Sequence, residues 1–580
     1  AQWQLSPADG TLQVHVLKAQ RLIIELKETD KPAEASSGLP EKITLPLPIS
    51  ITQAEIKEVL IISKGEQQVL HQVRFNLAAN AKHITLNLSQ AQTPWGAVHA
   101  NVQLGTVKPF PLQGLVQVTK LETGNDADLE YDFKTTLSGS LEQLNFNSDH
   151  VLAQHQGKLR LQPADASVGT ANIAGRITLD GFISLAQDQA LQLKLRVSDL
   201  RTEGLGSYPQ AQLNLEANIN GKLQPQPDLQ MQLRTTNSHW RNHPLDLQAN
   251  INWLNNQLQV LSLQANLGKN QLQAKGELGT DNSVLNWQAS LPQLNAFDAE
   301  LSGDLMAKGV LKGSVENLIS TLIMEAKNLQ HGAQFKLASM QADAEIQHTT
   351  SGKLAAKVSA NALQIGERPA LNLQADLSGT LAEHALTITA KNPQQQWIVA
   401  FNGGIKTLNQ DKFWQGFLQQ LTYQGETNIA LKAPAPLKLS AQHTRIEKAT
   451  LQFASGLVDI TLVDLNQGQL STQGTISKLR LTDLPEDIFM MPNSLQGSPT
   501  FSGDWNITAQ EQINGGIKLA RDDGDFMINK FNAKPEPLGL NKASFVLNIV
   551  NGKIDANLDV AGEKLGTIQA QLNTVISKTA

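Results

Sequence analysis

The 580-residue sequence predicts an all-β fold, a very long, curled, mainly antiparallel sheet that forms an elongated, taco-like groove with an apolar interior. Two observations carry this prediction. Leucine and other apolar residues occupy alternate positions in segment after segment, for example in 191–197, 213–219 and 371–377. Gly, Asn and Asp turns such as Asn551-Gly552 separate these segments. Because a strand points successive side chains to opposite faces, each segment gives a ribbon with one apolar and one polar side.

The number of such segments decides between two architectures. At about 12–14 residues per strand and turn, the chain supplies roughly 40 strands, which in one sheet would span on the order of 200 Å. Open sheets of more than ~10 strands usually curl or split, so a row of β-sandwiches is the alternative. Aromatic residues are only 5% of the chain, whereas sandwich cores usually need bulky anchors. We therefore expect a trough that its own side chains do not fill and that holds an apolar ligand such as acyl chains.

Composition divides the chain into three parts. Residues 1–27 read as entry strands, 28–44 as a flexible linker rich in Glu, Ser, Pro and Gly, and 45–580 as a continuous repetitive groove. An apolar–polar–Gly–polar–apolar signature recurs with glycines 82, 82 and 76 residues apart, at Gly139, Gly221, Gly303 and Gly379. This spacing predicts quasi-repeats of about 80 residues, each a unit of a solenoid-like sheet.

Two segments predict short helices that cross the sheet. Residues 411–421 carry apolar residues at helical spacing, namely Phe413, Trp414, Phe417, Leu418 and Leu421. Residues 483–491 begin with an Asp cap and are followed by a proline that would stop a helix.

Charge and cysteine content exclude several classes of protein. A net charge of −6 and a pI of about 6.1 argue against a nucleic-acid-binding surface. The chain has no Cys, which excludes a disulfide framework and a cysteine metal site. No apolar stretch reaches the ~18 residues of a transmembrane helix. Because the chain starts at Ala1, we expect it to be a mature or excised segment of a longer protein.

Candidate chemical groups do not assemble into a recognisable site. His239 and His243 are four residues apart, but Pro244 predicts a turn, and on a strand the two would lie ~13 Å apart. His150 and His155, beside Asp149, are interpreted as residues of a solvated loop, and the three aspartates of 522–525 as a solvated hairpin tip. Asp126, Asp128 and Glu130 resemble the start of a calcium loop, but Tyr131 stands where the tight turn of such a loop needs Gly. We therefore expect no catalytic residues, no metal site, no cofactor and no enzymatic activity.

Three stretches of the sequence resemble a known family. They are the proline-flanked strands Leu45–Leu60, the Trp-Gln-Gly segment Trp414–Tyr423 leading into Leu431–Leu437, and a third stretch made of Gly503–Ile507, Gly515–Arg521 and Gly524–Asp525. The chain is similar in these stretches to the TamB family of AsmA-like proteins, relatives of the bridge-like lipid-transfer proteins. The family's inner-membrane anchor and its C-terminal domain, which engages an Omp85-type barrel of the outer membrane, are expected to lie outside this segment.

This resemblance implies a non-enzymatic, monomeric bridge in the periplasm of a Gram-negative cell. It would carry phospholipids between the inner and outer membranes along the groove. The alternative is a scaffold or chaperone that assists insertion of outer-membrane or autotransporter proteins. A purely structural adhesin or β-helical passenger is a third class, against which the ~80-residue period speaks.

The residues expected to line the groove are alternate apolar residues from several strands. They are Leu191, Leu193, Leu195, Leu213, Leu215, Ile219, Leu261, Leu263, Leu371 and Leu373.

Overall fold

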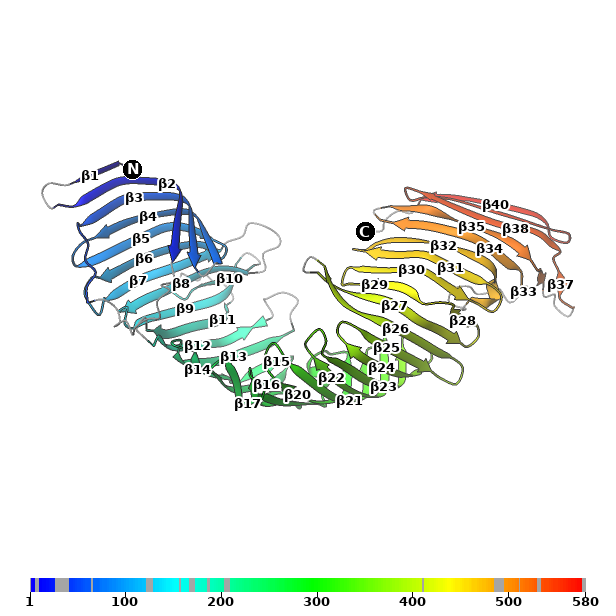
Figure 1. Cartoon of the computed structure of the whole chain (residues 1–580), viewed down its shortest axis with the longest axis horizontal. Helices are drawn as coiled ribbons and strands as arrows, with labels where there is room; N and C mark the ends of the chain where they lie inside the picture. The colour runs from blue at the N-terminus through cyan, green and yellow to red at the C-terminus, as the bar shows by residue number, and fades with distance from the viewer. Residues whose placement is uncertain are drawn as a thin grey trace. The chain divides into compact units, whose positions relative to one another are not determined.

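The computed structural model describes residues 2–5, 10–26, 41–63, 66–120, 129–155, 158–165, 173–184, 188–202, 209–408, 411–484, 495–510, 512–528 and 534–575. The chain divides into two compact units. Unit 1 consists of residues 1–299 and 312–315, and unit 2 of residues 300–311 and 316–580. Within each unit most strands lie beside the strands that precede and follow them in the chain (Figure 1). The predicted all-β fold is confirmed.

Unit 1 holds strands β1 to β19 and one short 3₁₀ turn, η2. Their bounds are β1 Gln2–Leu5, β2 Leu12–Leu26, β3 Ile49–Ser63, β4 Glu66–Ala79, β5 His83–Thr93, β6 Gly96–Gly105, β7 Leu112–Lys120, β8 Leu129–Gly139, β9 Leu144–His155, β10 Lys158–Pro163, β11 Ile173–Ile183, β12 Ala190–Arg201, β13 Ala211–Lys222, β14 Asp228–Thr235, β15 Ser238–Trp240, β16 His243–Leu254, β17 Gln257–Leu267, β18 Asn270–Leu278, β19 Val284–Leu291 and η2 Leu294–Ala296.

The sheet of unit 1 is antiparallel with two exceptions. Strands β2 and β3 run parallel. Strand β10 pairs antiparallel with β9 and parallel with β8, so it is inserted between the two where they diverge. Short hairpins join many of the other neighbours, such as β16 to β17 and β17 to β18, which explains the regular spacing of Gly and Asn in the sequence.

Unit 2 holds the remaining strands and a second 3₁₀ turn, η3. Their bounds are β20 Leu301–Lys312, β21 Ile319–His331, β22 Phe335–Gln347, β23 Lys353–Ile365, β24 Leu371–Thr380, β25 His384–Lys391, β26 Gln396–Leu408, β27 Asp411–Gln424, β28 Asn428–Leu431, β29 Ala435–Leu439, β30 His443–Gln452, β31 Leu457–Asn466, β32 Gln469–Arg480, η3 Leu481–Asp483, β33 Leu495–Gly497, β34 Thr500–Ala509, β35 Ile513–Asp523, β36 Phe526–Ile528, β37 Glu536–Pro537, β38 Leu540–Val550, β39 Lys553–Gly562 and β40 Gly566–Val575. Strands β33, β36 and β37 form a small separate sheet, and the others belong to the long one.

Each unit is an open, curled sheet and not a row of sandwiches. The chain has an accessible surface of 35157 Å², whereas a globular protein of 63.0 kDa exposes about 20,000 Å². Along β24 the apolar residues Leu371 and Leu373 are half-buried, while Asn372 and Gln374 between them are exposed. The sheet therefore curls towards its apolar face, where neighbouring side chains shield one another. Apart from the β33–β36–β37 sheet, the described residues include no second layer.

The prediction of a helix at 411–421 is wrong, because this segment is part of strand β27. Trp414 and Leu418 face the apolar side, opposite Ile405 and Phe401. A β-bulge follows, after which Leu421 occupies the same side. The extra residue turns an alternate-residue pattern into spacings of four and three, which are the spacings of one helix face.

The other predictions about segments have mixed outcomes. The helix expected at 483–491 begins at the end of η3, and its residues from 485 onward lie outside the described residues. Most of the predicted linker, 28–44, also lies outside them; its described part is 41–44, where Lys42 forms a β-bridge. The Asn551-Gly552 hairpin is confirmed between β38 and β39, with φ of +51° and +75°.

Candidate functional site

An apolar face runs across successive strands in unit 1. In the rows that cross the sheet, Leu195 lies between Leu179 of β11 and Ala217 of β13. The same row continues through β14, β16 and β17 to Leu263. Side chains of neighbouring strands therefore form continuous apolar rows at right angles to the strands. These rows arise because the alternation keeps the same register from strand to strand.

Nine of the ten residues expected to line the groove occupy this kind of position. Seven lie on the apolar face of unit 1 and are half-buried: Leu191, Leu193, Leu195, Leu213, Leu215, Ile219 and Leu263. Leu371 and Leu373 lie on the corresponding face of unit 2. Leu261 differs, since it is the extra residue of a β-bulge in β17 and is 51% exposed. That these side chains contact a ligand stays a prediction.

The face is not equally open along its length. In β3 to β5 the side chains of Ile56, Val59, Val73 and Ala91 pack into a buried cluster, each at most 7% exposed. In β12 the corresponding apolar residues are only half-buried. The first strands of unit 1 thus fill their own apolar face, and Leu152 and Ala174 form a second buried cluster in β9 and β11. Strand β12 leaves its apolar face accessible.

β-Bulges recur near the ends of strands, and the alternating pattern of the sequence does not predict them. Asp199 in β12, Ala362 in β23 and Lys478 in β32 each have φ of +52° and are each followed by a leucine. Each of their backbone N–H groups donates to a polar side chain of the next strand, Asn214, Asn372 or Ser502, at 2.8–3.0 Å.

These bulges keep the following leucine on the apolar face. Leu200 pairs with Leu213 after the bulge, just as Val197 pairs with Leu215 before it. A bulge also bends its strand and increases the local twist, so a series of them curls the sheet. The signal in the sequence is a single-residue slip in the alternation just before a Leu that is followed by Arg or Gln.

The glycines of the recurring signature sit where the chain comes closest to a neighbouring backbone. Gly139, Gly221, Gly303 and Gly379 have φ between +104° and +149°, a range that L side chains rarely adopt. A Cβ atom at each of them would overlap a carbonyl oxygen of the adjoining backbone. The glycine of the signature therefore marks positions where an adjoining backbone leaves no room for a side chain. The ~80-residue quasi-repeat itself stays a prediction.

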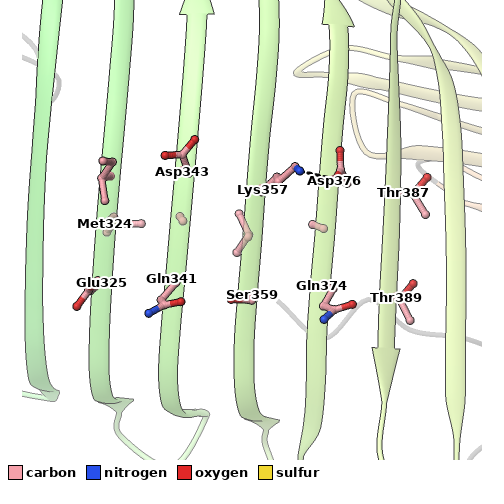
Figure 2. A pocket seen from close by; sticks show the side chains of 14 residues that line it. Met324, Glu325, Gln341, Asp343, Lys357, Ser359, Gln374, Asp376, Thr387 and Thr389 are labelled. Atoms are coloured by element: carbon pink, nitrogen blue, oxygen red, sulfur yellow. Dashed lines mark ion pairs between the residues drawn. The ribbon is translucent and has the colours of Figure 1, made fainter.

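The opposite face of the sheet is polar. Figure 2 shows it across β21 to β25, where Asp343, Lys357 and Asp376 point from neighbouring strands to the same side. Lys357 and Asp376 form an ion pair at 4.0 Å. A shallow hollow lies between this row and a parallel row that contains Gln341 and Ser359. Exposed ion pairs of this kind add little stability. The main effect of these polar side chains is that this face of the sheet is hydrated.

One charged trio stands out on the polar face of unit 1. Glu216 accepts hydrogen bonds from Arg196, at 3.0 Å, and from Arg234, at 2.9 Å, on the strands to either side. These bonds lower the pKa of Glu216, with the larger effect coming from Arg234. The trio links three strands and leaves Glu216 fully engaged on the face away from Leu215.

The histidines for which the structure describes the side chain belong to no cluster of three metal-ligating groups. His239 and His243 flank the turn between β15 and β16, as the sequence predicts. The prediction of a loop at His150 is wrong. This residue lies in β9 and is 1% exposed, and its ring stacks on that of Phe133 with 4.5 Å between the ring centroids. Its Nε2 accepts the Lys134 N–H where β8 and β9 diverge, and burial lowers its pKa. The described residues contain no group of three metal-ligating side chains. The side chain of His155 and residues 126–128 lie outside the described part.

The acidic turn 522–525 has a structural role. Asp525 accepts the N–H groups of Gly539 and Leu540 at 2.7 and 3.1 Å, and so anchors the start of β38. Asp522 accepts the hydroxyl of Ser502 at 2.6 Å. No helix in the described residues is long and apolar enough to cross a membrane.

The comparison with known families agrees with this architecture. Residues 155–579, well over half of the chain, match the model of the family described as "TamB, N-terminal domain". No curated protein and no solved structure matches the chain. The chain therefore belongs to the TamB family of cell-envelope proteins, whose role lies in outer-membrane protein assembly or lipid transport.

Proposed function

We propose that the apolar face is a conduit along which phospholipid acyl chains pass between the inner and outer membranes. The observation that carries the proposal is an uncovered, half-buried apolar face that continues from strand to strand in each unit. Apolar surface of this extent marks a binding site in a protein that stays in water. Leucine and alanine rows without charged groups suit acyl chains of any headgroup, so selectivity would be weak.

The same proposal covers the surroundings of the protein. The chain would act as a non-enzymatic monomer in the periplasm, without a cofactor or nucleic acid. The inner membrane would supply lipid at one end, and an Omp85-type barrel of the outer membrane would be the partner at the other. Membership of the TamB family supports this placement.

Two adjacent positions on one strand test the conduit directly. A photo-crosslinking amino acid is placed at Leu193, on the apolar face, or at Gln192, which is exposed on the polar face of the same strand. The protein is purified from irradiated cells, and attached lipid is identified by mass spectrometry. We expect phospholipid adducts of mixed headgroup at position 193 and none at 192. Equal labelling, or none at either position, would contradict the proposal.

A second candidate function is supported by one edge of unit 2. Strand β40 is exposed at every residue and pairs only with β39 among the described strands. An exposed edge can accept a further strand by β-augmentation, as a scaffold for outer-membrane proteins would require. Prolines at Ala570 and at Gln571 test this, because adjacent N–H groups point to opposite sides. The variant that keeps its thermal stability should lose binding of an unfolded outer-membrane protein if β40 is the receiving edge.

A further inference from the structure

Two tryptophans of unit 2 lie against the apolar face in a particular way. Side chains of a strand stand roughly perpendicular to the sheet, and an upright indole would project far into the groove. Trp414 of β27 and Trp505 of β34 are half-buried, and each donates a hydrogen bond through its indole N–H. We propose that these tryptophans are held flat by glycine and a polar anchor, and that this arrangement keeps the groove of unit 2 open. The inference rests on the proposed function of the face as an acyl-chain conduit.

Trp414 lies over two glycines that face each other in β26 and β27. Gly403 and Gly416 are directly paired. A Cβ atom on Gly403 would come within 2.6 Å of Cζ2 of Trp414, and one on Gly416 within 2.7 Å of Cη2. The indole therefore occupies the space that side chains at these two positions would need. Any larger residue there would have to push the ring away from the sheet.

The indole N–H of Trp414 is held by a histidine. Its N–H donates to Nε2 of His384 at 2.8 Å, and His384 lies in β25, on the other side of β26 from Trp414. His384 can accept this bond because its Nδ1 lies 2.9 Å from the carbonyl oxygen of Thr380 and takes the donor role there. The indole and imidazole rings together span the width of β26 on its apolar face.

Trp505 repeats the arrangement with different partners. It is directly opposite Gly474 of β32, and a Cβ atom on that glycine would overlap the benzene part of the ring. Its N–H donates to the hydroxyl of Thr472 at 3.0 Å. Glycine beneath the ring and a polar anchor at its N–H thus occur at two separate places in the unit.

The physical reason for the anchor is the indole N–H itself. An acyl chain cannot accept a hydrogen bond, so a free N–H in a lipid-filled groove would be an unpaired polar group. Bonding to His384 or Thr472 satisfies the donor and selects the flat orientation. Glycine then provides the depth that the flat ring needs.

The experiment compares two glycines at which a Cβ atom would meet a backbone oxygen, at 2.4 Å for Gly474 and at 1.9 Å for Gly503. Gly474→Ala forces Trp505 to move. Gly503→Ala, on the same face of the next strand, meets the backbone oxygen of Lys518 and a leucine but no tryptophan. Each is made alone and with Trp505→Leu. Thr472→Val, which removes only the anchor, is also made alone and with Trp505→Leu, and it keeps the test informative if the glycine substitutions prevent folding. Phospholipid bound per purified chain is measured by mass spectrometry.

We expect Gly474→Ala and Thr472→Val to lose most of their bound phospholipid, and Trp505→Leu to restore it in both. Gly503→Ala should lose less, and Trp505→Leu should not change its lipid content. Equal losses in the two glycine variants without restoration by Trp505→Leu would overturn the role of tryptophan while leaving the conduit intact. A parent protein that carries no phospholipid would instead overturn the conduit.

Discussion

A single charge on the apolar face should block lipid without unfolding the sheet. Leu215 is half-buried in β13 between Val197 and Thr235. In Leu215→Arg the guanidinium would lie in a row between Val197 and Thr235, neither of which carries a charge. The adjacent Glu216 points to the opposite side and already bonds Arg196 and Arg234. An acyl chain passing this point must displace the water around an unpaired charge. A penalty of about 3 kcal/mol would lower lipid occupancy roughly 100-fold.

The effect on folding should be much smaller. A half-buried leucine contributes about 1 kcal/mol through apolar burial, and the arginine stem replaces part of that contact. The matched control is Gln232→Arg, on the exposed polar face between two uncharged amides, Asn218 and Asn250. Bound phospholipid and the rate of fluorescent phospholipid transfer between vesicles are measured for both variants. If Leu215→Arg carries and transfers as much lipid as Gln232→Arg, the reasoning about this face is refuted.

Three further predictions concern stability. Gly221→Ala, at φ +149°, should cost about 2–3 kcal/mol in urea unfolding, whereas Gly366→Ala, at φ +59° with open space around it, should cost about 1 kcal/mol; equal costs would contradict the close-approach explanation. A hydrogen bond from Arg176 lowers the pKa of Asp149, so stability from this pair is present above the ordinary Asp pKa and is lost as pH falls through the lowered one. Arg176→Gln should flatten that acid dependence, and an unchanged acid-unfolding curve would count against the pair. Burial lowers the pKa of His150, so the unfolded chain takes up the proton first. Stability should therefore fall as the pH drops below the ordinary pKa of histidine, and should stop falling once the lowered pKa of His150 is passed. His150→Gln should remove this slope in urea titrations, and a slope that persists would assign it to another group.

The sequence predicts the strands far better than it predicts where they slip. Alternation in 191–197 and 371–377 is a local property, so strands β12 and β24 follow from it directly. A bulge adds one residue and changes the period without changing residue type. This is why 411–421 resembles a helix and why Leu261 falls out of line with Leu263.

Contacts between residues that are distant in the sequence cannot be predicted from a local pattern. The hydrogen bond from Trp414 to His384 joins residues 30 positions apart. The polar stretch that begins at Asp149 predicts a loop at His150. Its burial depends on the insertion of β10 between β8 and β9, and no local pattern encodes that topology.

Pairing between nearest neighbours has a consequence for how such a protein can change over evolution. In the described part of unit 2, strands such as β22 to β26 bond only to the strands before and after them. A hairpin could therefore be added or removed without disturbing distant packing, as in other quasi-one-dimensional proteins. Each added hairpin would lengthen the sheet by about 10 Å. The length of the sheet could in this way change in steps of two strands.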